Sequence, residues 1–273
     1  MIPADPSPSS ASAPGPPAPP PTVEIVGTSL AATDYEEVMD WIDATVAANG
    51  RVCLTAAAVH LVMVAREDPE TRAAVDRALA VPDGQPLVWA MRALGHRRAT
   101  RVYGPDLMAN YCERSARTGV KMYLYGGRNQ GALVQLTLEL RRRFPGLDVV
   151  GGYSPPFRPL TDEEEARVIA EIDGSGAQVV WVGTGQPKQE RWMARMRDRL
   201  DAPVLVGVGA AFDFHAGLVA QAPPWMQRIG LEWLFRLSRE PRRLWRRYAR
   251  YNPLFVWGFA RQYAASRRRS ARR

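Results

Sequence analysis

The chain has 273 residues, of which 36 are basic and 28 acidic, so its formal net charge is +8. A share of 46% hydrophobic and 23% charged residues is typical of a globular protein and argues against a disordered one. Two cysteines, Cys53 and Cys112, are too few for a disulfide framework or a thiolate zinc site, so we expect a reducing compartment. No apolar run approaches the ~18 residues of a membrane-spanning helix, and the first residues lack the basic and apolar regions of a secretory signal.

The positive charge is concentrated near the carboxyl end of the chain. Residues 236–273 contain 13 arginines and a single acid, Glu240, which gives this segment a net charge of +12. Residues 1–235 carry a net charge of −4. The sequence therefore predicts a slightly acidic body with a strongly basic tail.

The first 22 residues contain nine of the 23 prolines, together with Ser, Ala and Gly. Such a segment buries too little apolar surface to offset the entropy of ordering it, so we expect a disordered or polyproline-like leader. We divide the chain into this leader at 1–22, an α/β body at 23–220, a helical appendage at 221–263 and a basic tail at 264–273.

The body alternates between short apolar runs and helical periods. Strands are predicted at 51–59, 121–127, 147–153, 177–185 and 202–212, and helices at 68–81, 129–145, 161–172 and 187–200. Asp68-Pro69 and Thr161 are typical helix-start residues. Continuously apolar strands that alternate with helices predict a mostly parallel, Rossmann-like sheet with helices on both faces. In such sheets ligands bind outside the carboxyl ends of the strands.

The appendage mixes aromatic residues and arginines at helical spacing. Pro241 and Pro253 are expected to break it into two or three short helices, which a solvated basic run follows. Its four tryptophans, with the surrounding Leu, Phe and Arg, suit an anionic membrane surface. Two alternatives remain at this point: aromatic residues that pack on the body, and a nucleic-acid contact by arginines next to Trp245, Tyr248 and Tyr251.

Polar residues follow several of the predicted strands. Thr55 lies late in the first strand, where threonine is an ordinary strand residue. Asp83 lies in a Pro-Asp-Gly sequence, and from spacing alone a turn is a better interpretation than a general base. Asp213 follows the last strand, where binding of a ribose diol and capping of a helix are comparable interpretations. Tyr125 and Gly126 either line a ligand site or belong to the core.

A glycine-containing loop follows the strand at 177–185 and precedes a helix. Gly183 and Gly185 favour the approach of backbone amides to a phosphate at the helix N-terminus. The loop is neither a P-loop nor G-x-G-x-x-G, because Lys188 stands where the last glycine should be. This departure weakens the alternative of an NAD(P)-dependent oxidoreductase.

We predict neither a metal nor a cofactor. His60, His96 and His215 lack metal-ligand spacing, and no Asp-x-Asp sequence offers a carboxylate pair to a divalent ion.

Seven segments in this order resemble the WecG/TagA/CpsF glycosyltransferases, glycosyltransferase family 26, from about Val23 to Arg247. They are PDG (82–84), RVYGPDL (101–107), YGG (125–127), VGTGQPKQE (182–190), VGAAFDFHAG (208–217), APPW (222–225) and LEWLFRLxxEPxR (231–243).

The resemblance implies an inverting, metal-independent transfer of a hexose or an N-acetylhexosamine or its uronate. The donor would be a UDP-sugar and the acceptor a polyprenyl-diphosphate-linked saccharide, in the synthesis of bacterial surface polysaccharides. It further implies a cytoplasmic protein at the inner face of the cell membrane, compatible with a small homo-oligomer and without a nucleic-acid partner.

The same resemblance suggests roles for individual residues. Asp83 is similar to the general base for the acceptor hydroxyl, and Thr55 to a threonine near the donor site. Many relatives have Thr-x-Asn there, whereas this chain has Ala57 in place of the asparagine. The residues implied in substrate binding are Arg101, Gln186, Gln189, Glu190 and Asp213. The appendage arginines implied to reach the departing UDP are Arg236, Arg242 and Arg243, with Arg239 and Arg246 as further candidates.

Overall fold

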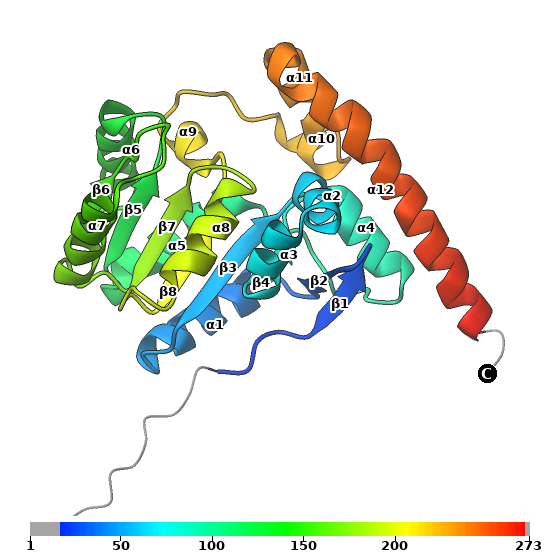
Figure 1. Ribbon diagram of the computed structural model, residues 1–273, viewed down its shortest axis with the longest axis horizontal. Helices are drawn as coiled ribbons and strands as arrows, with labels where there is room; N and C mark the ends of the chain where they lie inside the picture. The colour runs from blue at the N-terminus through cyan, green and yellow to red at the C-terminus, as the bar shows by residue number, and fades with distance from the viewer. Residues whose placement is uncertain (1–16, 271–273) are drawn as a thin grey trace, which may run out of the picture.

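The structure, a computed structural model, describes residues 17–270 (Figure 1). In chain order the elements are β1 Thr22–Ile25, β2 Thr28–Ala31, α1 Tyr35–Ala47, β3 Val52–Ala57, α2 Val59–Glu67, α3 Pro69–Asp76, β4 Leu79–Pro82, α4 Gln85–Ala93, α5 Gly104–Thr118, β5 Met122–Gly126, α6 Gln130–Arg143, β6 Val149–Tyr153, α7 Asp162–Gly174, β7 Val179–Gly183, α8 Lys188–Met196, β8 Val204–Gly207, α9 Ala211–His215, α10 Pro224–Arg228, α11 Glu232–Arg239 and α12 Pro241–Ser270.

Six of the strands form one sheet in the order β4-β3-β8-β7-β5-β6, and all of its pairings are parallel. β1 and β2 form a separate antiparallel pair. Helices cover the parallel sheet, so the Rossmann-like α/β fold predicted from the sequence is confirmed. All six carboxyl ends lie at one edge, where each strand passes into a loop.

Alternate residues of the strands point to opposite faces of the sheet and enter two different clusters. Leu54 and Val206 belong to a large cluster that they share with buried residues of α1, α5 and α6. Their neighbours Cys53 and Leu205 belong to a second cluster, shared with α7 and α8. Burial on both faces explains why these strands are apolar at every position rather than at alternate ones.

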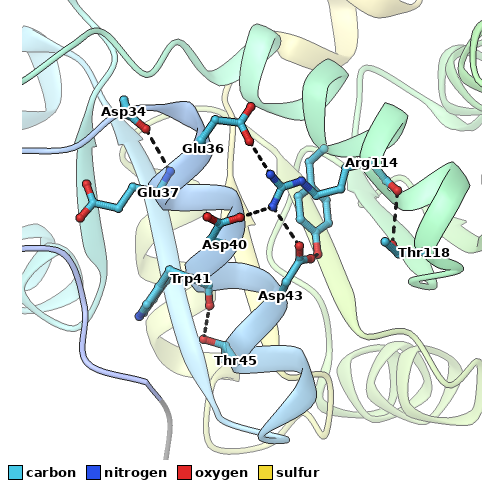
Figure 2. Close-up of polar contacts among 10 residues, drawn as sticks. Asp34, Glu36, Glu37, Asp40, Trp41, Asp43, Thr45, Arg114 and Thr118 are labelled. Carbon is cyan, nitrogen blue, oxygen red and sulfur yellow. Dashed lines mark hydrogen bonds and ion pairs between the residues drawn. The ribbon is translucent and has the colours of Figure 1, made fainter.

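Charged side chains at the surface reinforce the packing of α1 against α5. Arg114 of α5 lies 2.6 Å from Asp40 and 3.0 Å from Asp43, and it also pairs with Glu36 (Figure 2). The Asp34 side chain caps α1 by accepting a hydrogen bond from the amide of Glu37. Because α1 and α5 cover the sheet on the face away from α8, these contacts hold the scaffold on which the loops of the carboxyl edge rest.

A third cluster joins β1, β2, α2 and α4 to the long carboxyl-terminal helix α12. Phe255 of α12 is buried in it. About two helical turns after Phe255, the Gln262 side chain accepts a hydrogen bond from the Val26 amide at 2.8 Å and donates one to the Glu24 carbonyl at 2.6 Å. The helix therefore lies along α2 and β1 as part of the fold, as Figure 1 shows.

Two predicted boundaries of the body are wrong. The helix expected over 68–81 ends at Asp76, and Leu79–Pro82 forms the edge strand β4, because this apolar segment pairs with β3 instead of continuing the helix. The strand expected over 202–212 ends at Gly207, and α9 begins at Ala211.

The expected break of the appendage is confirmed at Pro241, where α11 has ended at Arg239 and α12 begins, and it is wrong at Pro253. Pro241 begins α12, where the missing amide hydrogen costs nothing, and the helix continues through Pro253 to Ser270. The buried Phe255 and the two Gln262 hydrogen bonds follow Pro253 and hold that part of the helix against the body. The predicted division between an appendage at 221–263 and a tail at 264–273 therefore falls inside one helix.

Part of the proline-rich leader is described. The Pro17 carbonyl accepts a hydrogen bond from the Trp41 indole, Pro20 is buried, and Thr22 is the first residue of β1. The end of the leader is therefore attached to the body at Pro17, Pro20 and Thr22, and the disorder expected for residues 1–16 lies outside the described part of the chain. Among residues 17–270, no helix combines the length and the apolar character needed to cross a bilayer.

Candidate active site

A cavity of about 2040 Å³ lies at the carboxyl edge of the sheet. Its walls come from the loops that follow β4, β5, β6, β7 and β8, and from α11 and α12. Ten of the residues predicted from the sequence line it: Asp83, Arg101, Tyr125, Gly183, Gly185, Gln186, Lys188, Asp213, Arg236 and Arg243. The parallel topology brings these residues together from positions up to 160 residues apart in the sequence.

Asp83 is held at the end of β4 by backbone contacts. Its amide donates to the Ala57 carbonyl at 3.0 Å, and its Oδ1 accepts a hydrogen bond from the Gly104 amide at 2.8 Å. Within the described residues its second carboxylate oxygen has no hydrogen-bond partner, and the side chain lines the cavity. Asp83 therefore presents one free carboxylate oxygen to a ligand.

The surroundings of Asp83 adjust its basicity. Burial raises the pKa of Asp83 from 3.8 to about 6; Arg101 and Arg236 oppose this shift, whereas Glu232 adds to it. A carboxylate with a pKa near 6 is ionised at neutral pH and is still a stronger base than an exposed aspartate. It is thus suited to general-base catalysis.

Arg101 connects Asp83 to the appendage. Its Nε donates to the Asp83 carbonyl at 2.5 Å, and its Nη2 pairs with Glu232 at the start of α11. Its guanidinium also lies 4.0 Å from the centre of the Tyr103 ring. The side chains of Arg101 and Glu232 are largely shielded from solvent, at 15% and 13% exposure. The position of α11 is thereby coupled to the candidate base.

The appendage arginines fall into two groups. Arg236, Arg243 and Arg247 line the cavity, and Arg236 lies over the Phe214 ring. The Nε of Arg247 is buried without a hydrogen-bond partner among the described residues. Arg243, by contrast, forms an ion pair with Glu240. Arg242 is exposed and does not line the cavity, so the structure does not bring this predicted residue into the site.

Four of the predicted binding residues lie beneath the cavity wall instead of lining it: Thr55, Gly126, Gln189 and Glu190. The Thr55 hydroxyl donates to Glu190 Oε1 at 2.7 Å, and the Gln189 amide donates to the same oxygen at 2.9 Å. Gln189 Oε1 in turn accepts a hydrogen bond from the Gly209 amide. This network ties the helix α8 to the loop after β8 and so acts on the site through the backbone. Burial raises the pKa of Glu190, whose Oε2 has no partner among the described residues.

Two glycines at the strand ends are required by close packing. A Cβ on Gly126 would lie 2.6 Å from the backbone carbon of Gly183, and its φ of +134° is one that other residues rarely adopt. A Cβ on Gly183 would lie 2.6 Å from the Phe212 ring. Gly126 therefore allows the carboxyl ends of β5 and β7 to lie close together, and Gly183 makes room for Phe212 of α9.

The remaining predicted residues lie on the β5–β7 side of the cavity. Asp213 pairs with Arg128 through both carboxylate oxygens, at 2.9 and 3.2 Å, so neither interpretation of Asp213 from the sequence included its actual partner. Tyr125 stacks on Trp192 with ring centres 3.8 Å apart. The Gln186 amide donates to the Ala56 carbonyl at 2.6 Å and so links the loop after β7 to β3.

Sequence reasoning missed Tyr103, Glu232 and Arg247 as site residues. Tyr103 and Glu232 lie inside the quoted segments RVYGPDL and LEWLFRLxxEPxR, which was a signal for both. Arg247 is one of many arginines in α12, and the sequence offered nothing to separate it from its neighbours. Among residues 17–270, no cluster of three or more His, Cys, Asp or Glu side chains has the arrangement of a metal site.

One comparison with known proteins bears on this site. The model of the family described as Glycosyl transferase WecG/TagA/CpsF family matches residues 23–269. The match extends past Arg247, near which the resemblance recognised in the sequence ends, and includes nearly all of α12. It thus covers the sheet, the cavity and the appendage as one unit. The chain therefore belongs to the glycosyl transferase WecG/TagA/CpsF family, whose members are glycosyltransferases of cell-surface polysaccharide synthesis.

Proposed function

We propose that the chain transfers a hexose or an N-acetylhexosamine, or its uronate, from a UDP-sugar to a polyprenyl-diphosphate-linked saccharide, with inversion at the anomeric carbon. Asp83 takes the proton from the acceptor hydroxyl while the oxygen attacks the anomeric carbon and the bond to UDP breaks. The observation that carries this proposal is the free carboxylate oxygen of Asp83, directed into a cavity lined by arginines.

Arginines supply the charge that the leaving UDP needs. Arg236 and Arg243 line the cavity on the side of the appendage, and a guanidinium can donate two parallel hydrogen bonds to a phosphate. Fixed cations at the position where negative charge develops lower the barrier without a metal ion. On this basis we propose metal-independent transfer that requires no cofactor.

The loop after β7 is the proposed site of the donor. Gly183, Gly185, Gln186 and Lys188 line the cavity where α8 begins, and Lys188 is an exposed cation at that helix N-terminus. Backbone amides at a helix N-terminus favour phosphate, and Asp213 with Arg128 lies on the same side of the cavity. This arrangement supports a UDP-sugar more than NAD(P), for which the third glycine is missing.

The direct test is an assay of Asp83→Asn with a panel of UDP-sugars and lipid-linked mono- and disaccharide acceptors. Asparagine keeps the size of the side chain and an oxygen for the Gly104 amide, but it cannot accept a proton. We expect the rate of transfer to fall about 10²–10⁴-fold, with UDP binding retained. Undiminished turnover in a folded variant would exclude Asp83 as the base.

The matched control is Asp162→Asn, which removes a carboxylate at the outer rim of the same cavity. We expect this variant to transfer sugar at close to the wild-type rate, because Asp162 is exposed and follows β6, the edge strand of the sheet opposite to β4. Repeating the wild-type assay in the presence of a chelator tests metal independence separately. Loss of activity that Mg²⁺ or Mn²⁺ restores would contradict that part of the proposal.

A further inference from the structure

Part of the cavity is lined by residues of α12 on one side and of α2 and α4 on the other, and we call this part the apolar arm. The residues of α12 that line it are Asn252, Phe255, Val256, Phe259, Ala260 and Tyr263. They recur at intervals of three or four and so share one face of the helix. From Asn252 to Tyr263 this face extends about 16 Å, at ~1.5 Å per residue.

The opposite wall of the arm is apolar as well. It is formed by Val59 of α2 and by Pro86, Trp89 and Ala93 of α4. His60 is the titratable side chain of this wall, and burial, with a contribution from Arg247, lowers its pKa to about 4. The imidazole is therefore neutral at physiological pH, so the arm offers hydrocarbon contacts without a fixed charge of its own.

The arm begins at the charged part of the site. Arg247, with its unpaired Nε, precedes Asn252 by little more than one turn of α12 and lies close enough to His60 to affect its pKa, and it lines the same cavity as Asp83. Val256, which lines the arm, and its neighbour Trp257 are 66% and 56% exposed, so the arm is open to the surface of α12. The cavity therefore combines the candidate base and several arginines with a part that apolar side chains line.

We propose that this arm binds the first isoprene units of the acceptor lipid, with the acceptor diphosphate at Arg247. The proposal rests on the proposed function and identifies where the chain holds the lipid part of its substrate. An isoprene unit adds four bonds to an extended chain, and three backbone bonds span about 3.5 Å, so an arm of ~16 Å takes about three units. A free fatty acid or a second copy of the chain would not need both the arginine and the base next to the arm.

Soluble diphosphates of increasing chain length test the arm without a membrane. The probes are inorganic diphosphate, isopentenyl, geranyl and farnesyl diphosphate, measured below the concentration at which any of them aggregates. Dissociation constants come from the fluorescence of the protein and from calorimetry. We expect each added isoprene unit to tighten binding by about tenfold, because each buries several methylene-sized groups.

Two variants that fill the arm give the decisive comparison. Ala260→Trp and Ala93→Trp place an indole in the arm from opposite walls, and Ala249→Trp adds the same bulk to an exposed position of α12 outside the cavity. We expect both arm variants to bind all four probes about as weakly as inorganic diphosphate, while Ala249→Trp keeps the wild-type series. Affinity for UDP should be unchanged in all three, which shows that they are folded.

The outcomes separate this proposal from the proposed function. If the wild-type protein binds all four diphosphates equally, or if Ala260→Trp and Ala93→Trp keep the full chain-length series, the arm does not hold the isoprenoid. In either case transfer of sugar to the lipid-linked acceptor still reports on the enzyme itself. If the wild-type protein transfers no sugar from any UDP donor, the proposed function fails, whatever the diphosphates show.

Discussion

At the scale of single residues, the chemistry of the site depends on the surroundings of one carboxylate, that of Asp83. A Pro-Asp-Gly turn on a protein surface would leave its aspartate with an ordinary pKa. Here the end of β4 places Asp83 against Gly104, Arg101 and Glu232, so that burial raises its pKa to about 6. The turn that the sequence indicates and the base that the resemblance implies are compatible, because the turn residue faces the cavity.

The raised pKa of Asp83 has a consequence for stability. Between pH ~4 and ~6 the folded state binds a proton that the unfolded state has lost, so stability falls as the pH rises through this window. We expect Asp83→Asn to remove this loss and to be more stable than the wild type above pH 6, by at most about 3 kcal/mol. Denaturant unfolding of both proteins at pH 4 and pH 7.5 measures this difference in the free energy of unfolding. Equal differences between the two proteins at both pH values would contradict the expected ionisation.

Glu232 is a second prediction at this scale, since it acts on Asp83 through Arg101. Glu232→Gln removes a negative charge that raises the pKa of Asp83 and leaves Arg101 as a stronger opposing cation. We expect the acidic limb of the pH–rate profile to move to lower pH, with the maximal rate reduced as well, because a weaker base accepts the proton. Glu139→Gln, which removes a carboxylate from an ion pair of α6 outside the cavity, serves as the control. A profile that keeps its acidic limb would show that Glu232 does not influence the base.

At the scale of elements, the sequence predicted the sheet well and the appendage poorly. Strands buried on both faces are apolar throughout, and the strands from β5 to β8 were found within a few residues at their starts. β4 was missed because four apolar residues directly after a helix fit the helical period as well as a strand. The unbroken α12 was missed because the contacts of Phe255 and Gln262, which hold the helix beyond Pro253, join residues more than 150 positions apart.

Some residues of the candidate site were predictable from the sequence, and others were not. Residues at the ends of predicted strands, such as Gly183 and Gly185, were predictable because parallel strands bring their carboxyl ends to one edge. The role of Asp83 was suggested only by the resemblance, because the strand that it follows, β4, was missed. The buried position of Thr55 and Glu190 was not predictable, because neither residue carries a local signal that separates a cavity wall from the layer below it. The choice between Arg242 and Arg247 depends on the rotation of α12 about its axis, which only its packing determines.

The glycine at the end of β5 gives a prediction for the sheet itself. A Cβ on Gly126 meets the backbone of Gly183 at 2.6 Å, and backbone of an adjacent strand cannot move aside as a side chain can. We expect Gly126→Ala to lower the free energy of unfolding by about 2–4 kcal/mol and to weaken UDP binding, because both strand ends border the cavity. Gly174→Ala, in open space at the end of α7, should be neutral or slightly stabilising. Equal thermal unfolding of the two variants would contradict the close approach of β5 and β7.

At the scale of the whole molecule, the net charge of +8 is the sum of a slightly acidic body and a strongly basic carboxyl-terminal segment. The described part of the basic segment is almost entirely α11 and α12, which begin at the cavity and end beyond β1 (Figure 1). Three arginines of this segment line the cavity: Arg236, Arg243 and Arg247. Three others are exposed at the far end of the helix: Arg267, Arg268 and Arg269. Exposed Leu254, Val256 and Trp257 lie between the two groups. A membrane surface that receives this side of α12 would present a lipid acceptor directly to the mouth of the apolar arm.

We therefore propose that the protein binds anionic membranes peripherally, and charge reversal at the end of α12 tests this. Each arginine near an anionic surface contributes about 1 kcal/mol, so replacing Arg267, Arg268 and Arg269 with Glu should reduce partitioning onto phosphatidylglycerol vesicles more than about a hundredfold. The same replacement at Arg141, Arg142 and Arg143 of α6, three exposed arginines away from α12 (Figure 1), changes the net charge identically and is the control. We expect that control to lose little binding. An equal loss in both variants would mean that only the net charge matters, and no loss in either would exclude the end of α12 as a membrane contact.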